Sequence, residues 1–134
     1  MPASLDDRAR ALLEAPNFCH LASHREDGTI HTVVVWAHPH DDEVWLNSAE
    51  GRVWPANVRR DPQVTLTVTN SENPYEYVEI LGRVVGDTHD GADEDIDALA
   101  KKYMGVDTYP FRQPGEQRIV FRVQPEKVRV QKAG

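Results

Sequence analysis

The chain has 134 residues, of which 40% are hydrophobic, and its formal net charge is −7 at pH 7. This length predicts one domain spanning residues 1–134, and the acidic balance argues against a nucleic-acid partner. No apolar run approaches the roughly 20 residues that a membrane helix requires, and the polar, acidic N-terminal segment does not resemble a signal peptide. We therefore expect a cytoplasmic protein without a membrane partner, and the single Cys19 excludes an intramolecular disulfide.

The first part of the chain predicts one helix followed by hairpin-connected strands. Ser4 is a suitable N-cap for the helix, and Pro16 ends it. Short apolar segments separated by turns predict strands at 18–23, 30–38 and 43–47. The middle of the second strand, Thr32-Val-Val-Val-Trp36, is apolar on both faces, so it must be covered on both sides.

The rest of the chain alternates strands with two helices. A short basic helix precedes a strand over 63–70, in which Val64, Leu66 and Val68 share one face. A helix over 92–103 begins with acidic residues and is followed by Gly105. The remaining strands are predicted at 75–87, 117–124 and 127–131, the last two separated by Pro125. These elements predict a mostly β protein, a six- to seven-stranded antiparallel barrel with flanking helices.

The segment around the short basic helix is the most informative candidate site. Its start is flanked by Ser48, Arg52 and Asn57. The first N–H groups of a helix have no intrahelical partner, and the helix dipole is positive at that end. This combination predicts a binding site for a phosphate group.

A second candidate is the segment His38-Pro-His40-Asp-Asp42, because imidazoles and carboxylates are suitable metal ligands. The residues from Pro39 to Asp42 are predicted to form a hairpin turn, and no second cluster of ligands accompanies them. We therefore expect solvated side chains there and no metal site. Dinucleotide-binding and P-loop signatures are absent, and no arrangement of nucleophile and base identifies a catalytic residue.

Several motifs, in order along nearly the whole chain, resemble one known superfamily. They are Asn47-Ser with Gly51-Arg52, Asn57-Val-Arg-Arg-Asp-Pro62, Asn73-Pro-Tyr with Tyr77-Val-Glu-Ile-Leu-Gly82, and Ile96-Asp-Ala-Leu-Ala with Tyr109-Pro-Phe-Arg112. The pattern is similar to the flavin/deazaflavin oxidoreductase superfamily, the group with a pyridoxamine 5'-phosphate oxidase-like split β-barrel. The resemblance implies a homodimer of split barrels with two cofactor sites at the interface.

The resemblance also implies which side chains hold the cofactor. Ser48, Arg52 and Asn57 would contact the phosphate. Thr32, Val33 and Val34 would lie beside the rings. The partner subunit would contribute Tyr77, Tyr109 and Arg112.

The chain departs from the family pattern at the short helix. Relatives usually carry Lys or Arg where this chain has Trp54, and often Arg where it has Ala56. Two interpretations of Trp54 remain open: its ring stacks on the cofactor, or it fills the dimer interface. The missing cations also leave open an altered phosphate affinity.

The short length and the segments Tyr103-Met-Gly105 and Tyr109-Pro-Phe-Arg112 resemble the branch that uses the deazaflavin coenzyme F420. The resemblance implies an F420-dependent oxidoreductase, which transfers hydride between the reduced cofactor and a small, conjugated organic substrate. Two alternatives are an FMN-binding oxidase or reductase of the same fold, and an F420- or flavin-binding protein without turnover. No acid or base is identified for the reaction.

Overall fold

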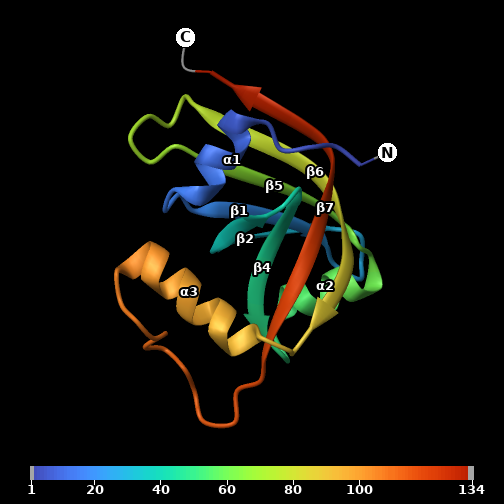
Figure 1. The fold of residues 1–134 in the computed structure, drawn as a ribbon. Coiled ribbons are helices and arrows are strands. Elements are labelled where there is room, and N and C mark those ends of the chain that lie inside the picture. Colours follow the sequence, from blue (N-terminus) through green and yellow to red (C-terminus); the bar gives the residue numbers. More distant parts are fainter. Residues whose placement is uncertain (1, 133–134) are drawn as a thin grey trace.

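The computed structural model describes residues 2–132, which form a seven-stranded antiparallel sheet and three helices (Figure 1). In chain order the elements are α1 (Asp7–Glu14), β1 (Cys19–His24), β2 (Ile30–Val35), β3 (Ala37–His40), β4 (Glu43–Ala49), α2 (Val53–Arg60), β5 (Gln63–Thr69), β6 (Tyr77–Thr88), α3 (Ala92–Met104) and β7 (Arg118–Gln131). The predicted mostly β, antiparallel architecture is confirmed. No helix among the described residues has the length and apolar character to cross a membrane.

The sheet curls into a half-barrel because its two edge strands are neighbours in the sequence. The strand order is β2-β1-β5-β6-β7-β4-β3, so β2 and β3 are the edges. Only Trp36 separates the end of β2 at Val35 from the start of β3 at Ala37. The predicted single strand over 30–38 was therefore wrong at this residue, where the chain leaves one edge of the sheet and enters the other.

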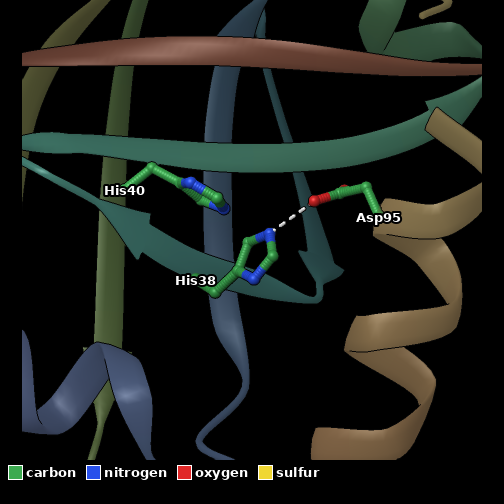
Figure 2. A group of neighbouring side chains, drawn as sticks. All are labelled: His38, His40 and Asp95. Carbon is green, nitrogen blue, oxygen red and sulfur yellow. Dashed lines mark hydrogen bonds and ion pairs between the residues drawn. The ribbon is translucent and has the colours of Figure 1, made fainter. Parts of the chain in front are cut away.

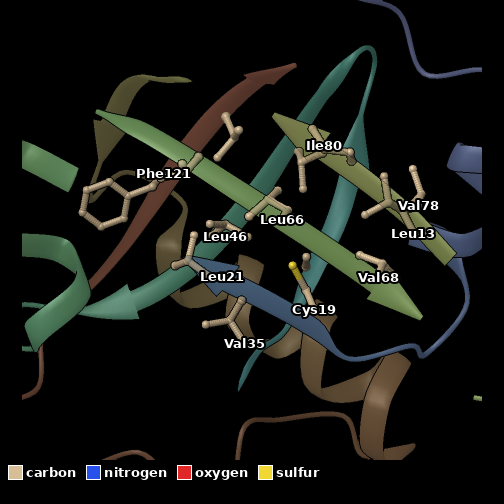
Figure 3. Packing of buried hydrophobic residues seen from close by; sticks show 14 of the residues in the cluster. Leu13, Cys19, Leu21, Val35, Leu46, Leu66, Val68, Val78, Ile80 and Phe121 are labelled. Atoms are coloured by element: carbon tan, nitrogen blue, oxygen red, sulfur yellow. The ribbon is translucent and has the colours of Figure 1, made fainter. Parts of the chain in front are cut away.

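The core lies on the concave side of the sheet, where alternate side chains of the strands meet (Figure 3). On β5 the predicted inward face is confirmed: Val64, Leu66 and Val68 are buried. Leu13 of α1 covers one side of this core. Cys19 is also fully buried, and burial raises the pKa of its thiol to about 12, so the thiol stays protonated and unreactive.

Two further predicted boundaries differ from the structure. The N-cap of α1 is Asp6 instead of Ser4, since the Asp6 carboxylate accepts from the backbone N–H of Ala9 at 2.8 Å. Pro125 does not interrupt β7, because it lies beyond Val123, the last β7 residue that pairs with β4. The sheet register against β6 shifts at that point, so no ladder hydrogen bond requires a proline N–H.

Aromatic and polar side chains hold α3 against the segment around Trp36, where β2 ends and β3 begins. We call this segment the strand junction. The Tyr103 ring stacks on Trp36 with centroids 5.2 Å apart, and its hydroxyl donates to Asn17 O at 2.7 Å. Lys102 donates from Nζ to the carbonyl oxygens of Leu13 and Ala37. Burial lowers the Lys102 pKa to about 8 and raises the Tyr103 pKa to about 12. The junction of the two edge strands is thereby held against a rigid helix.

Candidate functional site

A cavity of about 550 Å³ opens beside this junction, and we call it the apolar pocket. One wall is the run Val33-Val-Val-Trp36 at the end of β2. Tyr109 and Phe111, in the segment that follows α3, also line the pocket. Tyr109 meets Trp36 edge-on, with centroids 6.0 Å apart. These apolar and aromatic surfaces suit a flat ring system from which water is excluded.

The floor of the apolar pocket is polar and comes from β4 and the start of β7. Arg118 is buried there, donating from Nε to Asn47 Oδ1 at 3.0 Å and from its terminal nitrogen to Glu116 at 2.6 Å. Burial opposes ionisation of Glu116, but the hydrogen bond from Arg118 keeps the pKa of that carboxyl below its usual value. The Arg118 guanidinium also lies 5.1 Å from the centre of the Tyr109 ring. Arg118 and Glu116 therefore form an ion pair without net charge at the floor of the pocket.

Two buried polar atoms in the pocket have no hydrogen-bond partner among the described residues. They are Ser48 Oγ and His31 Nδ1. Ser48 is only 1% exposed. A buried hydroxyl without a partner costs about 1–3 kcal/mol, so these atoms mark the places where a ligand would restore hydrogen bonding.

A second cavity, the basic cleft, of about 630 Å³, adjoins the apolar pocket at the start of α2. It is lined by Arg25, Arg52, Asn57 and Arg60, together with the acidic Glu26 and Asp27. The Arg52 side chain makes no hydrogen bond or ion pair with any residue in 2–132, and it lines both cavities. A cation at the positive end of α2 is a suitable contact for an anion.

Asn57 lines the basic cleft, but its side-chain amide is occupied by hydrogen bonds to other residues of the chain. The residue is buried, its Nδ2 donates to Ser23 Oγ at 3.2 Å, and its Oδ1 accepts from Arg60 at 2.9 Å. Arg59, also on α2, lies outside the cleft and forms an ion pair with Glu50 at 2.7 Å. The cations that remain near the cleft are therefore Arg25, Arg52 and Arg60.

The structure brings most of the predicted cofactor residues together but not all. The apolar pocket is lined by Val33, Val34, Ser48, Arg52, Trp54 and Tyr109. Thr32, Tyr77 and Arg112 line neither cavity of this chain. Arg112 is bound to Asp93 and Asp97 of α3, at 2.7 and 2.8 Å. Contacts from a partner subunit, which the sequence predicted for Tyr77, Tyr109 and Arg112, stay a prediction.

Trp54 is mainly a core residue. It is 5% exposed and its ring lies 5.0 Å from that of Phe121, at an angle of 58°. Trp54 also lines the apolar pocket. Stacking on a cofactor and filling of a dimer interface both stay predictions, and either would have to use the small part of the ring that the core leaves uncovered.

Sequence reasoning missed the polar floor. No role was predicted for Arg118, yet it is 4% exposed. Asn47 was noted only as part of a motif, although it links Arg118 to Asp95 of α3. A signal was present in the alternation itself, since Glu116 and Arg118 are two residues apart and side chains at that spacing share one face of an extended chain. The ion pair between them is 2.6 Å long.

The predicted hairpin turn at 39–42 was wrong for its first half. His38 and His40 lie on β3, which pairs with β4, and only Asp41 and Asp42 turn. The two histidines point to the same face of the strand, as alternation requires. Asp95 of α3 lies next to them, so a ligand remote in sequence completes the cluster that the local pattern lacked.

The fold is that of a split-barrel protein, and two cavities that share Arg52 lie at the start of α2. Residues 5–132 match the pyridoxamine 5'-phosphate oxidase family, so the chain belongs to that family. No curated protein matches the chain at a significant level.

Solved structures agree with this assignment. A structure named F420 reductase is 26% identical, with a TM-score of 0.79, and the match covers 90% of this chain and 94% of that one. A putative pyridoxamine 5'-phosphate oxidase from Listeria innocua is 20% identical, with a TM-score of 0.72 and coverages of 95% and 98%. General stress protein 26 from Bacillus anthracis is 11% identical, with a TM-score of 0.70 and coverages of 93% and 92%. The latter two show the shared fold.

Proposed function

We propose that this protein is an oxidoreductase that binds coenzyme F420, with the ring system in the apolar pocket and the phosphate toward the basic cleft. The observation that carries the proposal is the direct connection of these two cavities through Arg52. One ligand with a flat apolar part and an anionic part fits such a pair. The 26% identity to a structure named F420 reductase supports the choice of coenzyme.

The residues present fit such a group. The run from Val33 to Trp36 offers an apolar surface, the Ser48 hydroxyl lacks a partner, and the Arg52 side chain makes no hydrogen bond or ion pair within 2–132. When bound, the coenzyme supplies the hydride chemistry; the protein supplies binding, orientation and exclusion of water. The substrate class that we propose is a small, conjugated organic molecule that lies against the same apolar surface.

A second copy of the chain is part of the proposal. The mouth of the apolar pocket is formed by large apolar side chains that are 52–58% exposed: Phe18, Val34, Val53 and Phe111. Exposed apolar groups clustered at one site are typical of an interface. A homodimer that covers this rim would enclose the ligand more fully than one small subunit does. Sedimentation equilibrium of the purified chain, with and without coenzyme, tests this part.

The test of the coenzyme is a titration of the purified full chain with F420 and, separately, with FMN, followed by coenzyme fluorescence. We expect F420 to bind and its reduced form to be consumed when a substrate is added. Arg52→Ala should weaken F420 binding by roughly 1.5–3 kcal/mol, about 10- to 150-fold. Arg129→Ala is the matched control, because Arg129 is exposed on β7 and lines neither cavity.

Each other outcome selects a different function. FMN that stays bound through purification, with no F420 binding, would make the protein an FMN enzyme of the same fold. F420 binding without turnover over a broad set of conjugated compounds would make it a coenzyme-binding protein. Binding of neither coenzyme overturns the proposal, and equal F420 affinity in wild type and Arg52→Ala moves the phosphate away from α2.

A further inference from the structure

Three potential metal ligands converge on the outer face of β3 and β4, beside the first turn of α3. They are His38, His40 and Asp95, and their ligand atoms all lie within 4.8 Å of one another. His38 Nε2 is 2.6 Å from Asp95 Oδ1. Figure 2 shows the His38 ring directed at Asp95, with the His40 ring nearby. Two imidazoles and one carboxylate are a donor set that Zn²⁺ and related transition metals prefer.

Asp95 is a buried carboxylate that forms no ion pair with an Arg or Lys side chain among the described residues. Its side chain is 6% exposed, and its ionic partner among the described residues is His38. The other carboxylate that contacts a histidine, Glu50, differs because Arg59 neutralises it at 2.7 Å. Buried charges are either fully paired or coordinate metals.

Neighbouring residues orient Asp95 and His40 through contacts that leave the proposed ligand atoms free of those neighbours. Asn47 donates to Asp95 Oδ2 at 2.8 Å, which leaves Oδ1 directed at the histidines. The His40 ring stacks on Trp45 with centroids 3.7 Å apart and planes 12° apart. The His40 ring makes no hydrogen bond with residues 2–132, so both of its ring nitrogens are available. Contacts of this kind around metal ligands fix their orientation.

The spacing requires only small movements to accept an ion. Zinc bonds of about 2.0–2.2 Å place tetrahedral ligand atoms roughly 3.4 Å apart. The separations here start at 2.6 Å for His38 and Asp95 and do not exceed 4.8 Å for any pair. Side-chain shifts of about 1 Å therefore suffice, opening the first contact and bringing His40 closer.

We propose that this cluster binds one Zn²⁺ or similar first-row transition-metal ion through His38 Nε2, a His40 ring nitrogen and Asp95 Oδ1, with water in the fourth position. A ligating imidazole nitrogen must be unprotonated, so binding through His38 Nε2 requires the tautomer that carries its proton on Nδ1. The ion joins edge strand β3 to α3, so it stabilises the folded chain. This site is separate from the apolar pocket and does not depend on the proposed coenzyme.

The direct test is a calorimetric titration of the full chain, freed of any affinity tag and stripped with a chelator, with ZnCl₂ and then with MgCl₂. We expect one Zn²⁺ per chain and no heat from Mg²⁺. The melting temperature should rise with Zn²⁺ concentration. A chain that binds no Zn²⁺ overturns the proposal.

Variants locate the ion. His40→Ala should bind Zn²⁺ at least tenfold more weakly and keep its fold, because the His40 side chain makes no hydrogen bond with residues 2–132. Asp95→Asn should also lose affinity, with circular dichroism to confirm folding. His89→Ala is the control, since His89 contacts Glu50 on another surface. Wild-type affinity in His40→Ala, or a loss in His89→Ala alone, would place the ion elsewhere and refute the site.

Discussion

Two buried serines should respond in opposite ways to the same substitution. Ser48 Oγ has no partner among residues 2–132, whereas Ser23 Oγ accepts a hydrogen bond from Asn57 Nδ2 at 3.2 Å. Both residues are nearly inaccessible, at 1% and 2% exposure. Replacing each with alanine removes one oxygen atom from a similar environment, so the two variants differ mainly in whether a hydrogen bond is lost.

The magnitudes follow from this difference. Ser48→Ala removes an unsatisfied hydroxyl, whose burial costs about 1–3 kcal/mol, so the coenzyme-free protein should be unchanged or up to about 1 kcal/mol more stable. Ser23→Ala leaves the Asn57 amide without its acceptor and should cost about 1–3 kcal/mol. For a chain of this size 1 kcal/mol corresponds to about 4 °C in melting temperature. We therefore expect the two variants to melt at least about 4 °C apart.

Binding should reverse the order. If Ser48 contacts the phosphate, Ser48→Ala weakens coenzyme binding by about 1.5–3 kcal/mol, whereas Ser23→Ala leaves it nearly unchanged. The assays are urea denaturation of the coenzyme-free variants and fluorescence titration with F420. Equal destabilisation by the two substitutions would refute the reasoning, because it would mean that Ser48 already has a partner in the free protein.

The remaining predictions concern stability. Burial lowers the pKa of Lys102 to about 8, so between about pH 8 and pH 10.5 the unfolded chain binds a proton that the folded chain lacks. Over that range the wild type should gain stability relative to Lys102→Met as the pH rises, measured by urea denaturation; a constant difference would contradict it. Gly82→Ala would bring a Cβ to 2.7 Å from Val123 Cγ1 and 3.0 Å from Gln124 O, and should cost about 1–3 kcal/mol. Gly86→Ala is its control, because only the flexible end of a side chain lies in the way, and equal costs would argue against the steric explanation.

The strand pattern was predictable because alternation and turn residues act locally. Val64, Leu66 and Val68 show the period of two that a half-buried strand requires, and their burial is confirmed. The break at Trp36 was not predictable in this way. Apolar residues continue through it, and only the closing of the sheet on itself forces the chain to change edges there.

The candidate site was predictable where its residues are adjacent in sequence. Ser48 and Arg52 flank one helix, so they were found together. Arg118 and Asp95 were missed, because their contacts run through Asn47, which is more than 40 residues from both. Their burial depends on how α3 and β7 cover β4, and no short-range pattern in the sequence records that arrangement.

The position of Trp36 limits how the protein can be redesigned. Trp36 lies between the two edge strands β2 and β3, and its side chain also forms part of the wall of the apolar pocket. An engineer who wants a different ligand preference has little freedom there, since any change reshapes the barrel seam as well. Phe18, Val53 and Phe111 offer the opposite case: they are half-exposed at the entrance, outside the strand junction, so they are the practical positions for a focused library.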